Sequence, residues 1–168
     1  MQKEAAQAGE HIATIETSHG TMVCRLFTTL VPGAVKNFVE LAKAGKYEGV
    51  PFHRIIEDFM IQGGDFENGN GTGGYSYEGE GTNICDEFHD ELSHIKGALS
   101  YAKTQAPCSI GSQFFIVHPK AGTGFLDHPK GGGKAEGYTV FGQLQEDCFD
   151  VLDAIATVPT GRNDAPTE

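Results

Sequence analysis

Short segments with the composition of β-strands recur along this chain, and turn-forming residues separate them. Most are rich in β-branched or aromatic residues, and strict alternation puts Met22, Cys24 and Leu26 on one face of a strand. Many short strands of this kind are typical of antiparallel β architectures. The expected strands are 11–17, 21–27, 52–57, 59–62, 97–102, 113–117 and 138–144.

Two further segments have the periodicity of helices. After Pro32, which suits a first turn, apolar residues recur at 35, 38, 39 and 42, and Gly45 can end the helix. The same spacing is found over 148–157. We therefore predict a mainly β fold, an antiparallel barrel whose ends are covered by two α-helices.

The length and charge of the chain narrow the classes of function. Its 168 residues are enough for one domain with a sizeable core, and we expect a polar N-terminal tail at 1–10 and a single domain at 11–168. The 23 acidic side chains outnumber the 12 basic ones, and the formal net charge is −11. Because nucleic-acid binding relies on lysines and arginines that neutralise phosphates, we expect no nucleic-acid partner.

We expect neither a membrane segment nor an export signal. It has no run of about 18 apolar residues, and residues 1–10 lack the apolar stretch of a secretory signal. The cysteines stand far apart, with no CxxC pair: Cys24, Cys85, Cys108 and Cys148. We therefore expect reduced thiols, no membrane association and a cytoplasmic location.

Three patterns that could carry other chemistry are incomplete. The stretch 69–74 formally satisfies the GxGxxG dinucleotide pattern, but no amphipathic helix follows it to receive a phosphate. The acidic stretch 86–91 with His94 lacks the ligand spacing of the common zinc and calcium loops, so we expect a solvated acidic loop there. Two serines near His118 lack a GxSxG elbow, which disfavours hydrolysis. The expectation is no metal and no cofactor.

Two strings of residues are more distinctive. The first reads FHRII at 52–56 and FMIQGGD at 59–65, which sets one arginine and one glutamine among apolar residues. Taken alone, it is also compatible with two ordinary strands whose polar residues face water. The second reads GSQFFI at 111–116, where Gln113 and Phe115 are two positions apart and emerge on the same face of a strand. FLD at 125–127 and YTVFG at 138–142 complete the set.

These strings closely resemble the cyclophilin family. The similarity runs from about residue 11 to 160 and includes NGNGTGG at 68–74 as the family's glycine loop; 103–107 and 137–138 look most like its bacterial cytosolic branch. The resemblance implies a closed eight-stranded antiparallel β-barrel capped by two helices, with a substrate groove on its outer face. It also implies a peptidyl-prolyl cis–trans isomerase that assists protein folding and uses no cofactor.

The chemistry of that reaction explains which residues suit the site. Rotation about an X-Pro bond faces a barrier of roughly 18–20 kcal/mol, because amide resonance resists twisting. No bond breaks, so the enzyme must hold the proline ring and favour the twisted amide over both planar forms. An always-charged guanidinium can stabilise the lone pair that returns to the prolyl nitrogen. Arg54 is the natural donor, and the resemblance implies Arg54, Gln62 and Phe115 as the catalytic residues.

Other positions that match the family's groove are expected to bind the substrate. They are Phe59, Met60, Ala102, Lys103, Thr104, Gln113, Phe125, Leu126 and Tyr138. The pocket for the proline ring would consist of Phe59, Met60, Phe115 and Leu126. Gln113 would orient the substrate backbone, and Gln62 would bond to the substrate or hold Arg54 in place. The segment 102–104 would pair with the peptide through its main chain, so Lys103 in place of the family's usual asparagine should be tolerated.

Three features depart from the family's pattern. Phe125 stands where many eukaryotic members carry a tryptophan whose N–H donates to cyclosporin, so we expect weak cyclosporin binding with retained isomerase activity. Tyr138 occupies the position of a pocket histidine, so the rate should stay flat between about pH 6 and 8, apart from a mild slope from His53. No apolar alternation follows Val158, so we expect the family's last strand to be missing: either the chain is truncated or its barrel closes differently. A missing strand would leave a sheet edge unpaired.

The main hypothesis is an isomerase that acts on proline-containing polypeptides, as a monomer. The alternative is a proline-peptide-binding chaperone module with little turnover, and a scaffold domain is a third possibility. Arg54 favours the enzyme, because a module that only binds peptide needs no cation at the twisting bond.

Overall fold

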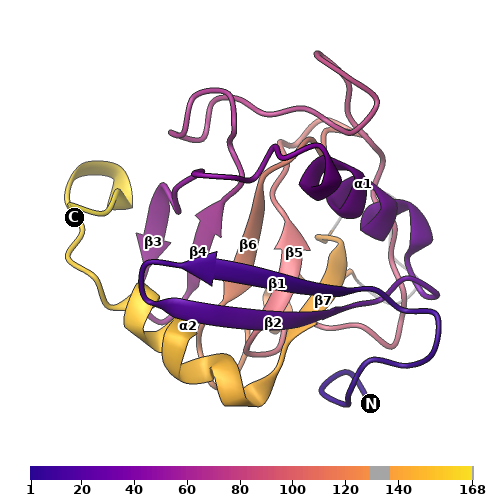
Figure 1. Cartoon of the computed structure of the whole chain (residues 1–168), viewed down its shortest axis with the longest axis horizontal. Helices are drawn as coiled ribbons and strands as arrows, with labels where there is room; N and C mark the ends of the chain where they lie inside the picture. The colour runs from indigo at the N-terminus through magenta and orange to yellow at the C-terminus, as the bar shows by residue number, and fades with distance from the viewer. Residues whose placement is uncertain (129–136, 168) are drawn as a thin grey trace.

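One antiparallel sheet of seven strands dominates the computed structural model, which describes residues 1–128 and 137–167 (Figure 1). The strand order is β1-β2-β7-β5-β6-β4-β3. The strands are β1 (Ile12–Thr17), β2 (Gly20–Leu26), β3 (Arg54–Ile56), β4 (Met60–Gly63), β5 (Ala98–Tyr101), β6 (Phe114–Val117) and β7 (Val140–Leu144). Each expected strand is therefore present close to its predicted position.

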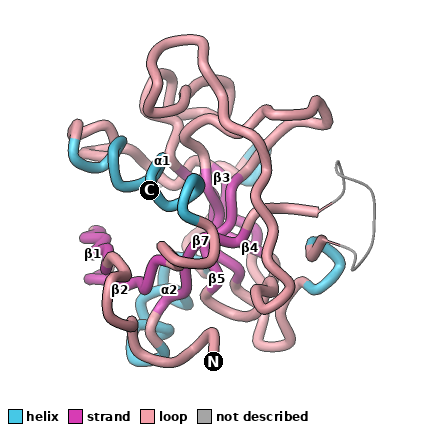
Figure 2. The backbone as a smooth tube through the Cα atoms, turned by 90° about the vertical axis from the view of Figure 1, so that its right-hand side faces the viewer, coloured by secondary structure: helices cyan, strands magenta, loops and turns pink. Residues whose placement is uncertain are grey.

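The sheet curls into half a barrel and does not close. Because β1 and β3 lie at its two edges, the closed eight-stranded barrel is not formed by the residues that the structure describes. After the last helix, Thr160 and Pro166 form an isolated bridge, and Arg162–Asp164 forms a short 3-10 turn. This C-terminal segment lies beside β3 (Figure 1), while long loops line the side of the strands away from β1 and β2 (Figure 2).

The two helices, α1 (Pro32–Lys43) and α2 (Phe149–Ala156), lie above and below the strands in the view of Figure 1. Pro32 occupies the first turn of α1, as its fixed φ favours. The expected helical spacing turns Val35 and Phe38 inward, where both are buried. Within the described ranges, no helix combines the length and the apolar character needed to cross a bilayer.

The core is a row of aliphatic residues across the inner face of the sheet. Strand register aligns Ile55 with Ile61, Ile61 with Ile116, and Ile116 with Leu99. None of the four is more than 3% exposed, and burying each such side chain contributes about 1.5–3 kcal/mol. Because side chains alternate between the faces of a strand, the next row of residues must point to the outer face.

Residues 1–10, expected as a polar tail, make specific contacts with the domain. The side-chain amide of Gln2 donates to the Ser93 carbonyl (2.8 Å) and to the Gln143 side-chain oxygen (3.0 Å). Glu10 and Arg25 form an ion pair at 2.7 Å, in which both side chains are at most 5% exposed. The hydrogen bond from Arg25 lowers the pKa of Glu10.

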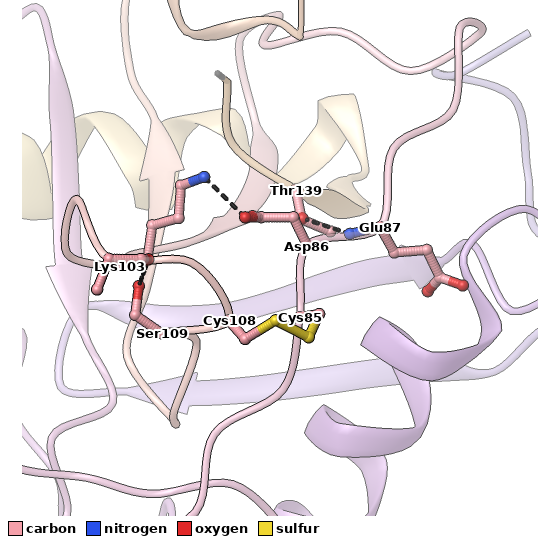
Figure 3. Close-up of a disulfide and its surroundings, with 8 residues drawn as sticks. Cys85, Asp86, Glu87, Lys103, Cys108, Ser109 and Thr139 are labelled. Carbon is pink, nitrogen blue, oxygen red and sulfur yellow. Dashed lines mark hydrogen bonds and ion pairs between the residues drawn. A yellow bond between two sulfur atoms is a disulfide. The ribbon is translucent and has the colours of Figure 1, made fainter. Parts of the chain in front are cut away.

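Two of the four cysteines are not the reduced thiols that the sequence led us to expect. Cys85 and Cys108 form a disulfide, so the prediction of four reduced thiols is wrong for these two (Figure 3). They are 23 residues apart in sequence, but an isolated bridge between Ile84 and Ile110 brings their loops together. Cys24 and Cys148 are free thiols, both buried, and burial raises the pKa of each.

Candidate active site

The three residues expected to be catalytic lie in one row across neighbouring strands. Strand register aligns Arg54 of β3 with Gln62 of β4, and Gln62 with Phe115 of β6. Directly opposed residues in antiparallel strands project from the same face, with Cβ atoms about 4.5–5.5 Å apart. The row next to the aliphatic core therefore brings a cation, an amide and an aromatic ring together on the outer face of the sheet.

Arg54 has no tight partner in this row. Its Nε lies 4.0 Å from Oδ2 of Asp164, and both side chains are about half exposed, at 45% and 48%. Ion pairs of this length and exposure contribute little to stability. The guanidinium is thus in a position to donate to a ligand on the outer face.

The two glutamines of the site are bonded to each other. Nε2 of Gln62 donates to Oε1 of Gln113 at 3.1 Å. Nε2 of Gln113 in turn donates to the carbonyl oxygens of Gly71 (2.9 Å) and Gly73 (2.8 Å). The side chain of Gln113 therefore connects the row on the sheet to the glycine loop.

The glycine loop is folded around a buried carboxylate. Asp65 is 1% exposed, and its two oxygens accept the backbone N–H groups of five residues at 2.9–3.2 Å. These residues are Glu67, Asn68, Asn70, Gly71 and Gly73. Burial raises the pKa of Asp65, but the N–H donors outweigh this and lower it to about 2. The donors that a phosphate would need are thus occupied, and this accounts for a GxGxxG pattern without a nucleotide site.

The loop also approaches the residue before Arg54. Gly71 has a φ of +97°, and a Cβ at this position would lie 3.0 Å from Nε2 of His53. Burial lowers the pKa of His53, and the charge of Asp65 opposes that effect only in part. A larger residue than glycine at 71 would therefore be strained twice, by its backbone and by the imidazole.

Phe115 belongs to a cluster of buried apolar side chains. Met60 is 2% exposed and Phe115 5%, while Phe59 and Leu126 are half-buried beside the core cluster. The ring of Tyr138 meets that of Phe115 edge-on, with the ring centroids 5.8 Å apart. The backbone N–H of Tyr138 donates to the Leu126 carbonyl at 3.0 Å. Tyr138 therefore contacts Phe115 directly, and the expected pocket residues Phe59, Met60 and Leu126 pack in the same apolar cluster.

Phe125 stands apart from this packing. It is 78% exposed and stacks on Phe59 with the ring centroids 6.1 Å apart. The expected substrate contact at this position is a solvent-facing aromatic ring without a hydrogen-bond donor.

His94 is a buried residue that the sequence did not single out for the site. It is 1% exposed and its ring stacks on Phe115, with the centroids 5.9 Å apart. Nδ1 lies 2.6 Å from Oδ1 of Asp127, and Nε2 lies 2.8 Å from Oγ of Ser100. Burial lowers the pKa of His94, although Asp127 opposes this. The expectation of a solvated acidic loop is therefore wrong at His94, whose acidic neighbours in sequence gave no sign of burial.

The order Ser100–His94–Asp127 has the connectivity of a hydrolase triad, but it cannot act as one. Ser100 is fully buried, and its hydroxyl donates to the carbonyl of Thr139 at 3.1 Å. A nucleophile needs an open path to its substrate. Asp127 and Ser100 instead hold His94, whose ring stacks on Phe115, next to a cavity of about 400 Å³ that His94, Asp127 and Tyr138 help to line.

The expected substrate segment 102–104 is held by bonds at each residue. The N–H of Ala102 donates to the Gln113 carbonyl at 3.0 Å, and the N–H of Thr104 donates to Oγ of Ser109 at 3.2 Å. Nζ of Lys103 lies 2.9 Å from Oδ2 of Asp86 (Figure 3). Asp86 is thus the second member of the acidic stretch that is not solvated as expected. Among the described residues, no group of three histidine, cysteine or carboxylate side chains is placed to hold a metal ion.

Comparison with known proteins identifies the family. Residues 12–168 match the family model described as cyclophilin type peptidyl-prolyl cis-trans isomerase/CLD. The chain is 37% identical to peptidyl-prolyl cis-trans isomerase B of Escherichia coli, an alignment that covers 94% of this chain and 93% of that protein. It is 42% identical to peptidyl-prolyl cis-trans isomerase-like 1 of Neurospora crassa, over 90% of this chain and 85% of that protein.

A longer relative is also similar. A Streptococcus pyogenes protein whose name joins a phosphatase to a peptidyl-prolyl cis-trans isomerase is 46% identical over 92% of this chain. The chain spans only 36% of the length of that protein.

Solved structures agree with the family model. A cyclophilin type peptidyl-prolyl cis-trans isomerase of Cryptosporidium parvum superposes with a TM-score of 0.82 at 33% identity, over 95% of this chain and 91% of that one. A second structure of that isomerase, solved in the presence of the dipeptide Ala-Pro, gives a TM-score of 0.81 at 33% identity, over 94% of this chain and 92% of that one.

The chain belongs to the cyclophilin-type peptidyl-prolyl cis–trans isomerases. Its homologues support the activity of a peptidyl-prolyl cis–trans isomerase, which in this family needs no cofactor. The resemblance drawn from the sequence motifs is thereby confirmed.

Proposed function

We propose that Arg54 is the group through which this chain accelerates X-Pro rotation, with Gln62 and Phe115 beside it. The observation that carries the proposal is the row across β3, β4 and β6, in which these residues are directly opposed. The proline ring would contact the face of Phe115 and its apolar neighbours. The half-exposed guanidinium of Arg54 would reach the prolyl nitrogen and the proline carbonyl.

Catalysis at this site rests on preferring the twisted amide. As the amide twists, its nitrogen regains a localised lone pair, and a fixed cationic donor binds that state better than either planar form. Each factor of ten in rate corresponds to about 1.4 kcal/mol removed from the rotation barrier. One preorganised donor is worth about 10²–10³ in rate in comparable sites, so Arg54 alone can supply a large share of the acceleration.

The partners proposed for this chain are proline-containing polypeptides, and its role would be to assist their folding. A related isomerase solved with Ala-Pro supports binding of short proline peptides. Cyclosporin binding is expected to be weak, because Phe125 offers no N–H donor. We expect a monomer.

A cytoplasmic location remains part of the proposal, but the Cys85–Cys108 disulfide removes the argument from reduced thiols. Disulfides persist mainly in oxidising compartments. Trapping free thiols in intact cells with a maleimide and counting the modified cysteines tests this point. Modification of Cys85 and Cys108 would support a reducing compartment, and protection of both would contradict it.

A protease-coupled or direct isomerase assay on a Xaa-Pro tetrapeptide tests the role of Arg54. Arg54→Ala should lower kcat/KM by about 10²-fold, because the twisted amide loses its cationic donor. Arg162→Ala is a matched control, since Arg162 lies outside the row, and it should retain the full rate. Full activity of Arg54→Ala contradicts the mechanism, and a wild-type protein that binds the peptide without turnover favours the chaperone alternative.

A further inference from the structure

Two cross-links tie the expected substrate segment to the stretch that follows the glycine loop. The connection between β5 and β6 holds Lys103 and Cys108, and their partners Asp86 and Cys85 are neighbours in sequence (Figure 3). The two connections also share backbone hydrogen bonds, from Ile84 N–H to the Ile110 carbonyl at 2.8 Å and from Ile110 N–H to the Ile84 carbonyl at 3.3 Å. The main chain at 102–104 is therefore anchored to the 84–88 stretch.

The charge of Lys103 is buried, unlike most lysines. Only 8% of its side chain and 10% of that of Asp86 are exposed, and the two are 2.9 Å apart. Nζ also lies 5.3 Å from the ring centroid of Tyr138 and 5.8 Å from that of Phe88. A desolvated ammonium beside a carboxylate and two ring faces has few alternative positions, so the pair fixes the segments that carry it.

The contacts of Asp86 extend to a third segment. Oγ1 of Thr139 donates to the second carboxylate oxygen of Asp86 at 3.2 Å and accepts the N–H of Glu87 at 3.0 Å. Thr139 is fully buried, and its carbonyl accepts the N–H of Tyr101 at 3.1 Å. The ion pair thereby joins 102–104, 86–88 and the residue next to Tyr138 into one unit.

We propose that Lys103 and Asp86 are positioning residues for substrate binding: their buried ion pair holds the main chain of 102–104 in place relative to the ring of Tyr138. This proposal rests on the proposed groove, which includes both segments. The ion pair contacts neither Arg54 nor Gln62, so it acts on the binding of the peptide and leaves the rotation step to Arg54. The Cys85–Cys108 disulfide, one residue from Asp86, supports the same unit from the solvent-exposed side.

The test separates binding from turnover. In Lys103→Met, the side chain keeps its length and loses its charge, so KM for a Xaa-Pro tetrapeptide should rise about five- to tenfold while kcat changes less than about twofold. Lys103→Arg should restore most of the affinity, because it restores the cation. Lys43→Met is the matched control: the Lys43–Glu40 pair is 68% and 45% exposed with its atoms 4.0 Å apart, and its loss should leave both constants unchanged.

A second variant covers the case in which Lys103→Met fails to fold. Lys103→Met combined with Asp86→Asn leaves no uncompensated buried charge, so the protein should fold and still show the raised KM. Reducing the disulfide with dithiothreitol should enlarge the effect of Lys103→Met on KM, because the segment then loses both cross-links.

Three results would overturn the proposal: an unchanged KM in folded Lys103→Met, a fall in kcat at constant KM, or an equal rise in Lys43→Met. Failure of the proposed site is recognised separately, through Arg54→Ala that retains its kcat. Loss of kcat in Arg54→Ala together with wild-type KM in Lys103→Met rejects only the positioning role.

Discussion

Arg54 and Lys103 are two cations of the proposed groove that the fold treats in opposite ways. Arg54 is 45% exposed, and its Nε lies 4.0 Å from Oδ2 of Asp164. Lys103 is 8% exposed and lies 2.9 Å from Asp86. A cation that must bind a substrate has to remain without a close counter-ion. A cation that fixes a loop is most effective when it is buried and paired with a carboxylate. Removing the carboxylate partner of each cation therefore tests the difference between the two roles most directly.

The largest effect is expected at the partner of Lys103. Asp86→Ala leaves the ammonium buried without a counter-ion and should lower the free energy of unfolding by about 3–5 kcal/mol. Asp164→Asn removes the charge of an exposed and distant partner, keeps a residue type that tolerates the positive φ at this position, and should change it by less than about 0.5 kcal/mol. Urea unfolding measures both. Equal losses in the two variants would show that the two cations are held in the same way.

The disulfide should contribute nearly as much to stability as the buried ion pair. Cys85 and Cys108 enclose a loop with a sequence separation of 23 residues, and the chain-entropy relation gives about 3 kcal/mol for such a loop. Cys85→Ser combined with Cys108→Ser should therefore unfold at lower urea concentration, with kcat for the tetrapeptide close to wild type. A large fall in kcat without a loss of stability would place the disulfide in the rotation step and contradict a purely structural role.

A smaller effect is expected for cyclosporin. Phe125→Trp adds an indole N–H on an exposed ring that already stacks on Phe59. One additional hydrogen bond is worth about 0.5–1.5 kcal/mol, so the inhibition constant should fall by about two- to tenfold. Isomerase activity in the absence of cyclosporin serves as the control and should not change. Unaltered inhibition would mean that the donor at this position is not what limits affinity.

The smallest effect concerns pH, because the guanidinium of Arg54 stays charged throughout the range. Isomerase activity should be flat between about pH 6 and 8, apart from a mild slope from His53. Stability should not be flat: burial lowers the pKa of His94 below its ordinary value of 6.5. The unfolded chain then takes up the proton first, so stability that is present above pH 6.5 is lost as the pH falls through the folded-state pKa.

Thermal unfolding at pH 8, 6.5 and 5 measures this loss. His94→Gln, which has no titrating ring, should show a shallower decline of Tm than the wild type below pH 6.5. Because burial also lowers the pKa of His53, some decline should remain in the variant. A decline as steep as that of the wild type would assign the pH dependence to other groups.

The resemblance of their motifs to the cyclophilin family predicts Arg54, Gln62 and Phe115 for the site, and local patterns predict the strands that carry them. Motifs located the strands, and the alternation of side chains along them placed Gln113 and Phe115 on a common face. Strand register then supplied the neighbours. The burial of Lys103, Asp86 and His94 depends instead on how the loops between β4 and β7 fold back on one another. No local period specifies such contacts.

The cysteines show the same limit. Nothing in their spacing connects Cys85 to Cys108, and the bridge between Ile84 and Ile110 exists only once both loops are folded. The closed barrel was expected from the resemblance alone, whereas the residues described here leave β1 and β3 as edges. Family resemblance predicted the residues of the proposed site, but it did not indicate which side chains hold the loops around it.

The glycine loop is an anion-binding site whose anion, the carboxylate of Asp65, belongs to the chain itself. Five N–H groups converge on the carboxylate of Asp65, so the shape of the loop does not depend on anything supplied by the solvent. In Asp65→Gly the carboxylate would be absent, and the five backbone N–H donors would remain. Adding formate should restore stability to this variant. The fold of the glycine loop would then depend on an anion from solution and not on a carboxylate of the chain.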